Sequence, residues 1–126
     1  MNPLRMLCTV VVLAAAGCAT TLPGTPIALD TVAVQSPSSC AGVGIAPFRI
    51  ELHDNAVQFV DVASGERRRL VWPSSIAARL VDGQVALYAS NGAVVARENE
   101  VIDDAGGCPR SDGSILVDAL RDRILT

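Results

Sequence analysis

The fold is indicated most clearly by the stretch ARLVDGQVALYASNGAVVAR, residues 78–97. Two turn signals, Asp82-Gly83 and Asn91-Gly92, divide this stretch into three short, largely apolar runs. Asp-Gly and Asn-Gly favour two-residue hairpin turns, because both central residues of a type I′ turn need a positive φ. The stretch therefore predicts three consecutive antiparallel strands.

Apolar runs separated by turn signals continue this pattern upstream, at 47–52, 56–62 and 66–72. Residues 52–60 also align with residues 80–88, either through duplication or because two β-meanders meet the same requirements. About six strands with one apolar face are expected to close into a small barrel or to stack as a sandwich. The predicted class is all-β, a small antiparallel meander.

The C-terminal segment fits two structures. Residues 114–117 follow an Asp-Gly turn and are apolar enough for a last strand. Leu116, Leu120 and Ile124 are spaced by four, which suits an amphipathic helix. A last strand that runs into a short C-terminal helix satisfies both patterns.

The N-terminus has the organisation of an export signal. Arg5 precedes the apolar run 6–16, which is too short to span a bilayer as a helix. A short apolar core behind a basic residue and ahead of small residues is typical of a secretory signal peptide. Residues 1–17 are therefore expected to be removed on export.

The residues at the cleavage point, Ala15-Ala16-Gly17-Cys18, resemble the lipobox of bacterial lipoproteins. The resemblance implies that the Cys18 thiol takes a diacylglycerol and that the new amine is acylated, which anchors the chain in a membrane stably. The family's usual Leu, three residues before the cysteine, is Ala15 here. In Gram-negative lipoproteins, an Asp directly after the lipidated cysteine resembles an inner-membrane retention signal. This chain has Ala19 at that position, so the resemblance implies the outer membrane, with the domain in the periplasm.

Residues 18–39 are rich in Thr, Pro and Ser, and we interpret them as the lipidated cysteine followed by a flexible tether. The apolar piece 27–34 within them is able to dock as an edge strand. Residues 40–126 form the expected β domain, which is large enough for one small core only.

The cysteines predict a disulfide in this domain. Cys8 leaves with the signal and Cys18 carries the lipid, so Cys40 and Cys108 remain as an even pair in an oxidising compartment. Two free buried thiols are the alternative. Two cysteines and one histidine are too few for a closed zinc site, and no metal or other cofactor is expected.

The charge balance bears on the class of partner. The chain has no lysine, and the mature part contains 9 of the 10 arginines and all 13 acidic residues, a side-chain net charge of 9 − 13 = −4. A mildly acidic, exported domain has no electrostatic reason to bind nucleic acid. Contact with the membrane is expected through the lipid alone.

The most distinctive local motif is Trp72-Pro73, which is followed by Asp82-Gly83 and by Gly-x-Val-Val-Ala-x-Glu at 92–98. This combination resembles a loose group of uncharacterised bacterial secreted proteins and lipoproteins, and it covers only the middle of the chain. The group implies no activity. Trp72 is interpreted as a core residue, because only four aromatic residues are available to fill the domain. The alternative is a half-exposed interaction anchor together with Arg69.

Three further features are candidates for chemistry. His53, the only histidine, is expected to lie exposed in a turn, and no Gly-x-Ser-x-Gly elbow accompanies it. Arg67-Arg68-Arg69 lies on an expected strand, so at least one guanidinium faces inward or lies at an edge. Edge protection is the ordinary explanation, and binding of a phosphate or carboxylate is the alternative.

An acidic stretch near residue 100 lacks the spacing of an EF-hand, and a solvated loop is expected rather than a calcium site. It contains Glu98, Glu100, Asp103 and Asp104.

These features together predict a non-enzymatic binding or structural module of the cell envelope, with an envelope protein or a cell-wall component as its partner. A small inhibitor of a periplasmic enzyme would have the same features. A hydrolase is the weaker alternative, because no nucleophile–base pair or metal-ligand set is evident.

Overall fold

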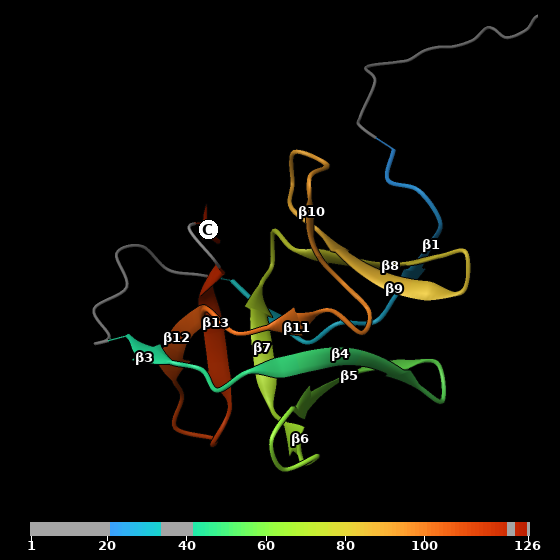
Figure 1. Ribbon diagram of the computed structural model, residues 1–126. Coiled ribbons are helices and arrows are strands. Elements are labelled where there is room, and N and C mark those ends of the chain that lie inside the picture. The colour runs from blue at the N-terminus through green and yellow to red at the C-terminus, as the bar shows by residue number, and fades with distance from the viewer. Residues whose placement is uncertain (1–20, 34–41, 121–122, 126) are drawn as a thin grey trace, which may run out of the picture.

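The computed structural model describes residues 21–33, 42–120 and 123–125, which contain β-strands and no helix. The predicted all-β class is confirmed. The strands form three separate sheets rather than one closed barrel within these residues, in a sandwich-like arrangement (Figure 1). None of the described segments is a helix with the length and hydropathy needed to cross a bilayer.

The first sheet has four strands in the order β1-β8-β9-β10: Thr25–Ile27 (β1), Ala77–Val81 (β8), Gln84–Tyr88 (β9) and Val94–Arg97 (β10). The second sheet has the order β11-β4-β5-β6: Val101–Ile102 (β11), Phe48–His53 (β4), Ala56–Asp61 (β5) and Arg67–Arg68 (β6). The third has the order β2-β7-β13-β12-β3, with β14 also paired to β13: Thr31–Val32 (β2), Leu70–Pro73 (β7), Ile115–Leu120 (β13), Ala105–Pro109 (β12), Val43–Gly44 (β3) and Arg123–Ile124 (β14).

Of the two turn signals in residues 78–97, Asp82-Gly83 forms the predicted two-residue turn. The prediction is wrong at Asn91-Gly92, where only Gly92 has a positive φ, 86°, and residues 89–93 connect β9 to β10. A further tight turn connects β4 to β5. Asp82 and Gly83 have φ values of 52° and 80° between β8 and β9. Asp54 and Asn55 have φ values of 51° and 62° between β4 and β5. Both pairs have the positive φ that a type I′ turn requires, so the similarity of the two segments extends to their backbone conformation.

The C-terminal helix predicted as an extension of the last strand is wrong for the described residues. Residues 115–120 form β13, which pairs in parallel with β7 on one side and antiparallel with β12 on the other. Arg123 and Ile124 form β14, which pairs back onto β13. A central strand gains hydrogen bonds along both edges, and this pairing outweighs a helical spacing of leucines.

The expected edge strand before Cys40 is present as β1 and β2. Strand β1 pairs with β8, and β2 pairs in parallel with β7. The guanidinium of Arg79 on β8 donates hydrogen bonds to the carbonyl oxygens of Leu22, Pro23 and Gly24, at 3.2, 3.0 and 2.7 Å. Part of the segment expected as a tether is thus held against the first sheet.

One core lies between the sheets and draws side chains from all three. Trp72 on β7 is 0% exposed, and its ring centroid lies 5.5 Å from that of Phe59 on β5. Phe59 packs edge-on against Phe48 at 6.0 Å. Leu87 of the first sheet is also fully buried. Few aromatic rings and many aliphatic side chains fill this core, as the composition predicts.

Candidate functional site

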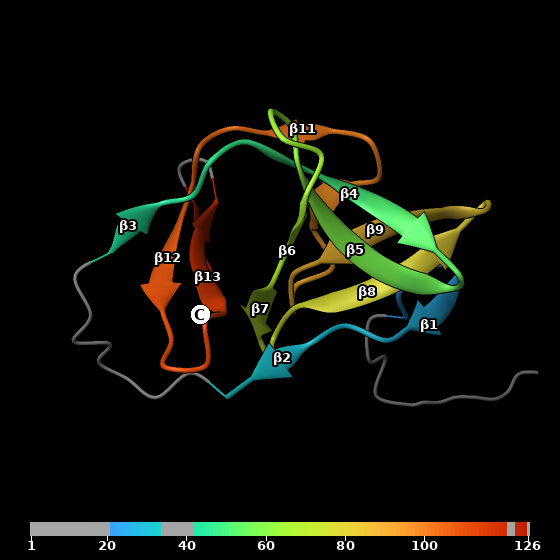
Figure 2. The same ribbon diagram turned by 90° about the horizontal axis from the view of Figure 1, so that it is seen from below.

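A groove of about 750 Å³ lies where the second and third sheets diverge. One wall is formed by residues 28–32, which lead into and include β2, and the opposite wall by residues 56–59 of β5. Residues 67–71, from β6 into β7, close one end together with the β12–β13 turn. Figure 2 views the molecule from a side on which β2, β5, β6 and β7 are all visible.

Four arginines line this groove and give it a basic end: Arg67, Arg68, Arg69 and Arg110. The first three belong to β6 and the residue that follows it, and the fourth comes from the β12–β13 turn. We call these four residues and the surrounding walls the arginine groove. Their partners differ, and the difference decides which of them is available to a ligand.

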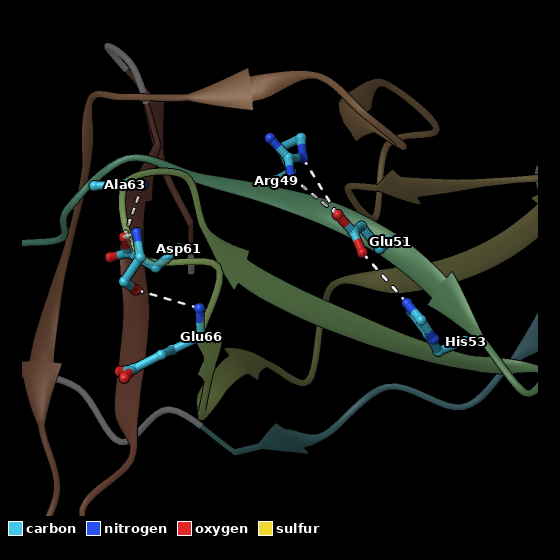
Figure 3. A network of polar contacts seen from close by, with 7 residues as sticks. Arg49, Glu51, His53, Asp61, Ala63 and Glu66 are labelled. Carbon is cyan, nitrogen blue, oxygen red and sulfur yellow. Dashed lines mark hydrogen bonds and ion pairs between the residues drawn. The ribbon is translucent and has the colours of Figure 1, made fainter.

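Arg68 is committed to a structural ion pair. Its guanidinium donates to Oδ2 of Asp61 through both Nε, at 3.1 Å, and Nη2. The other oxygen of Asp61 accepts the backbone N–H groups of Ala63 and Ser64, each at 2.9 Å. The guanidinium of Arg68, followed by the backbone N–H of Ser64, lowers the pKa of Asp61 to about 2, against an opposing effect of desolvation. Figure 3 shows Asp61 within the loop that these bonds organise.

Arg69 and Arg110 share one carboxylate. Arg69 donates to the carbonyl oxygen of Asp112 at 2.6 Å, and its Nη2 lies 3.7 Å from Oδ2 of the same residue. Nη1 of Arg110 lies 3.9 Å from that oxygen. The side-chain hydroxyl and then the backbone N–H of Ser114 lower the pKa of Asp112, with smaller contributions from the two arginines. The shared carboxylate stays ionised and offsets one of the two positive charges.

Arg67 is different, because its guanidinium has neither a hydrogen bond nor an ion pair with any residue that the structure describes. It is exposed and lies on β6 at the edge of the second sheet. The sequence expectation that the arginine run meets an edge is therefore confirmed. Counting Asp30, Asp61 and Asp112 against the four arginines leaves the groove at 4 − 3 = +1, in a chain with a formal net charge of −3.

Apolar side chains also line the groove, beside polar residues such as Asp30, Gln58 and Ser114. Leu29 and Val57 are half-buried on opposite walls, and Phe59, Leu70 and Val71 are buried at the base. Phe59 also packs against Trp72, so the groove is continuous with the core. A planar guanidinium beside apolar surface suits a carboxylate or phosphate carried on a partly apolar ligand.

Trp72 does not form the exposed anchor that was considered together with Arg69. Its side chain is fully buried, whereas the side chain of Arg69 is 67% exposed. Trp72 lies between β2 and β13 on the central part of the third sheet, where neighbouring strands cover it. The core interpretation, which the small number of aromatic residues favoured, is the one that the structure shows.

His53 ends β4 and is exposed, as expected. Its Nε2 lies 3.4 Å from Oε1 of Glu51, whose other oxygen accepts a hydrogen bond from Arg49 (Figure 3). These three side chains are two residues apart on one strand and so lie on one face of it. They form a network of polar side chains on β4.

Two carboxylates of the acidic stretch accept backbone N–H groups. Glu98 accepts the N–H of Val85 at 2.8 Å, and Glu100 accepts the N–H of Arg97 at 3.2 Å. Asp103 and Asp104 are exposed. Across the described ranges, no group of three or more His, Cys, Asp or Glu residues is placed to hold a metal ion.

The predicted modification sites lie partly outside the described residues. Cys18, the predicted lipidation site, and Cys40, the first half of the predicted disulfide, are both outside them. Cys108 is buried on β12, and its Sγ lies 3.4 Å from Oδ2 of Asp118 on β13.

Sequence analysis identified the arginine run but missed the rest of the groove. Arg110 is separated from Arg69 by 41 residues and reaches the site only because β13 pairs with β7. The wall at 28–32 was predicted to dock as an edge strand, but the sequence did not show that it would pair with β7. No protein-family model, curated protein or solved structure matches this chain.

Proposed function

We propose that this protein is a lipid-anchored, non-enzymatic binding module of the outer membrane, which holds an anionic group of an envelope partner in the arginine groove. The observation that carries the proposal is the guanidinium of Arg67, which pairs with none of the described residues and lies in a groove that Arg110 and several apolar side chains also line. A buried or half-buried apolar wall strengthens each charge-assisted hydrogen bond, since water competes less there.

The anchor rests on the lipobox-like residues 15–18. Two or three acyl chains on Cys18 would hold the domain stably, because one chain alone gives only marginal binding. The mildly acidic surface gives the domain no attraction of its own to an anionic membrane.

Substitution Cys18→Ser is expected to abolish labelling by an alkyne fatty acid and to release the protein from the membrane fraction. The thiol is the acceptor of the diacylglycerol, and serine does not replace it as a nucleophile. Fractionation of envelopes after metabolic labelling measures both effects, with Cys8→Ser as the matched control. An unlabelled Cys18→Ser variant that still sediments with membranes would count against the lipid anchor.

The disulfide between Cys40 and Cys108 is supported by strand register. Val43 of β3 pairs with Gly107 of β12, which is the residue before Cys108. Cys40 precedes Val43 by three residues, a distance of at most about 10 Å in an extended chain. A connection of this length is long enough for Cys40 to meet Cys108 while β3 keeps its pairing with β12, and an exported protein meets oxidising conditions.

The groove itself is tested with Arg67→Gln. In the full mature chain carrying Cys18→Ser, succinate and inorganic phosphate are expected to shift the amide resonances of residues 67–70 and 110–113. Arg67→Gln should weaken this binding by at least about tenfold, because a hydrogen bond to a charged group contributes about 1.5–3 kcal/mol.

Arg97→Gln is the matched control, because Arg97 is an exposed arginine on β10, outside the groove. It should leave the affinity unchanged, and added salt should weaken binding to the unsubstituted chain. Equal affinities for the Arg67→Gln and Arg97→Gln variants would remove the arginine groove as the binding site.

A further inference from the structure

One wall of the arginine groove is a strand edge with which no described strand pairs over residues 56–58. Strand β5 pairs with β4 along all six of its residues, but with β6 only at Phe59↔Arg68 and Val60↔Arg67. After Arg68 the chain leaves the second sheet, because Leu70–Pro73 joins the third sheet as β7. Residues 56–58 of β5 therefore line the groove without a described strand on that side.

The alternation of hydrogen bonds along β5 identifies the groups at this edge. The N–H of Asp61 donates to the carbonyl of Glu66 on the β6 side, whereas the N–H of Val62 donates to Pro47 on the β4 side. Successive residues of a strand direct their backbone groups to opposite edges. Val57, four residues before Asp61, thus presents its N–H and C=O to the same side as β6, where the groove lies.

The opposite wall is also a strand edge. The carbonyls of Asp30 and Val32 accept the N–H groups of Trp72 and Ser74, each at 2.9 Å, so these two residues direct their backbone groups towards β7. Thr31, between them, directs its own away from β7, and Thr31 also lines the groove. The groove thus runs between two strand edges, with apolar side chains at its base and arginines at one end.

A site with these properties suits an extended peptide better than a compact anion. A strand laid beside β5 forms main-chain hydrogen bonds with Val57 and continues the line that β6 begins. Its side chains alternate, so one set packs on Leu29 and Val57 while carboxylates reach Arg67 and Arg110. The positive charge of the groove end within an acidic chain favours an acidic segment over a basic one.

We propose that the arginine groove binds an extended acidic segment of a partner protein, which adds to the second sheet as a strand beside residues 56–58 of β5. This inference rests on the proposed function, since it uses the same groove, and it specifies the class of ligand and the mode of binding. The occupant is a partner's segment rather than a free phosphate, because a phosphate would leave both strand edges unused.

The test uses the full mature chain carrying Cys18→Ser and a probe peptide of seven alternating residues, acetyl-Val-Glu-Val-Glu-Val-Glu-Val-amide. Hydrogen exchange at the amide of Val57 reports the new strand pairing. Binding is expected to slow this exchange at least tenfold and to leave Gln58 unchanged, because Gln58 directs its N–H towards β4. The same peptide with Lys in place of Glu should not bind, and Arg67→Gln should weaken binding while Arg97→Gln should not.

The outcomes separate the two proposals. Two results would overturn strand addition but leave the anion site standing. In the first, the peptide binds without slowing exchange at Val57. In the second, the peptide does not bind, while succinate still binds in a way that depends on Arg67. Loss of Arg67 dependence for succinate, phosphate and peptide alike would overturn both. A third outcome would show that the chain itself covers the edge of β5. In that case, exchange at Val57 would already be slow in the free chain and would become fast when residues 34–39 are replaced by a Gly-Ser segment. This result would overturn the proposal of a partner's segment.

Discussion

Replacing Trp72 with alanine is expected to lower the free energy of unfolding by about 3–5 kcal/mol. The indole is fully buried, packs against Phe59 at 5.5 Å, and belongs to the strand that joins β2 to β13. Truncation removes apolar burial and leaves a cavity that the surrounding strands fill only in part. A loss of this size is a large share of the 5–15 kcal/mol that stabilises a typical domain.

Urea melts measure this effect, with a fall in the midpoint and an unchanged slope as the expected result. Trp72→Phe is the control. It keeps an aromatic ring and removes the indole N–H, which is buried and has no hydrogen-bond partner among the residues that the structure describes. Because an unsatisfied buried donor carries a cost, phenylalanine should destabilise much less than alanine. A Trp72→Ala midpoint equal to that of the unsubstituted protein would contradict the core role.

Reduction of the disulfide proposed between Cys40 and Cys108 is expected to cost about 4 kcal/mol of stability, because the bond closes a long loop and restricts the unfolded chain. The comparison is made on the Cys18→Ser chain, in which the lipid is absent and no core side chain is changed. Oxidised and reduced samples are melted in urea side by side.

Mass spectrometry under non-reducing conditions should first show a peptide that links Cys40 to Cys108. The double variant Cys40→Ala/Cys108→Ala is the control, and its stability should be insensitive to reductant. Alkylation of both thiols in freshly isolated, folded protein without reductant would show that the bond is not formed.

The parts of this fold that could be predicted from sequence are those fixed by neighbouring residues. Asp82-Gly83 and Asp54-Asn55 specify their hairpins because the turn itself demands positive φ at those positions. The C-terminal segment could not be assigned in the same way. Its strand depends on pairing with β7, more than 40 residues earlier in the chain, and leucines spaced by four fit a strand as well as a helix.

Of the candidate site, only the run of three arginines at 67–69 could be identified from the sequence. The arginine run indicated an edge, because alternate side chains on a strand point to opposite faces. Its role as one end of a groove depends on the divergence of β6 and β7 into different sheets, which no local pattern encodes. Arg67 and Arg68 are adjacent in sequence, yet only the second meets the buried carboxylate of Asp61.

The contacts of Arg79 with the carbonyls of residues 22–24 determine the length of chain that would connect the lipid anchor to the folded domain. In the lipidated chain proposed above, only three residues, 19–21, lie between the acylated Cys18 and Leu22, the first residue that Arg79 holds. The four steps from Cys18 to Leu22 span at most about 14 Å in an extended chain, close to the ~13 Å radius of gyration of a domain of about 100 residues. The domain would therefore stay close to the membrane surface and would not extend into the periplasm. Its partners would have to be located at or near the bilayer.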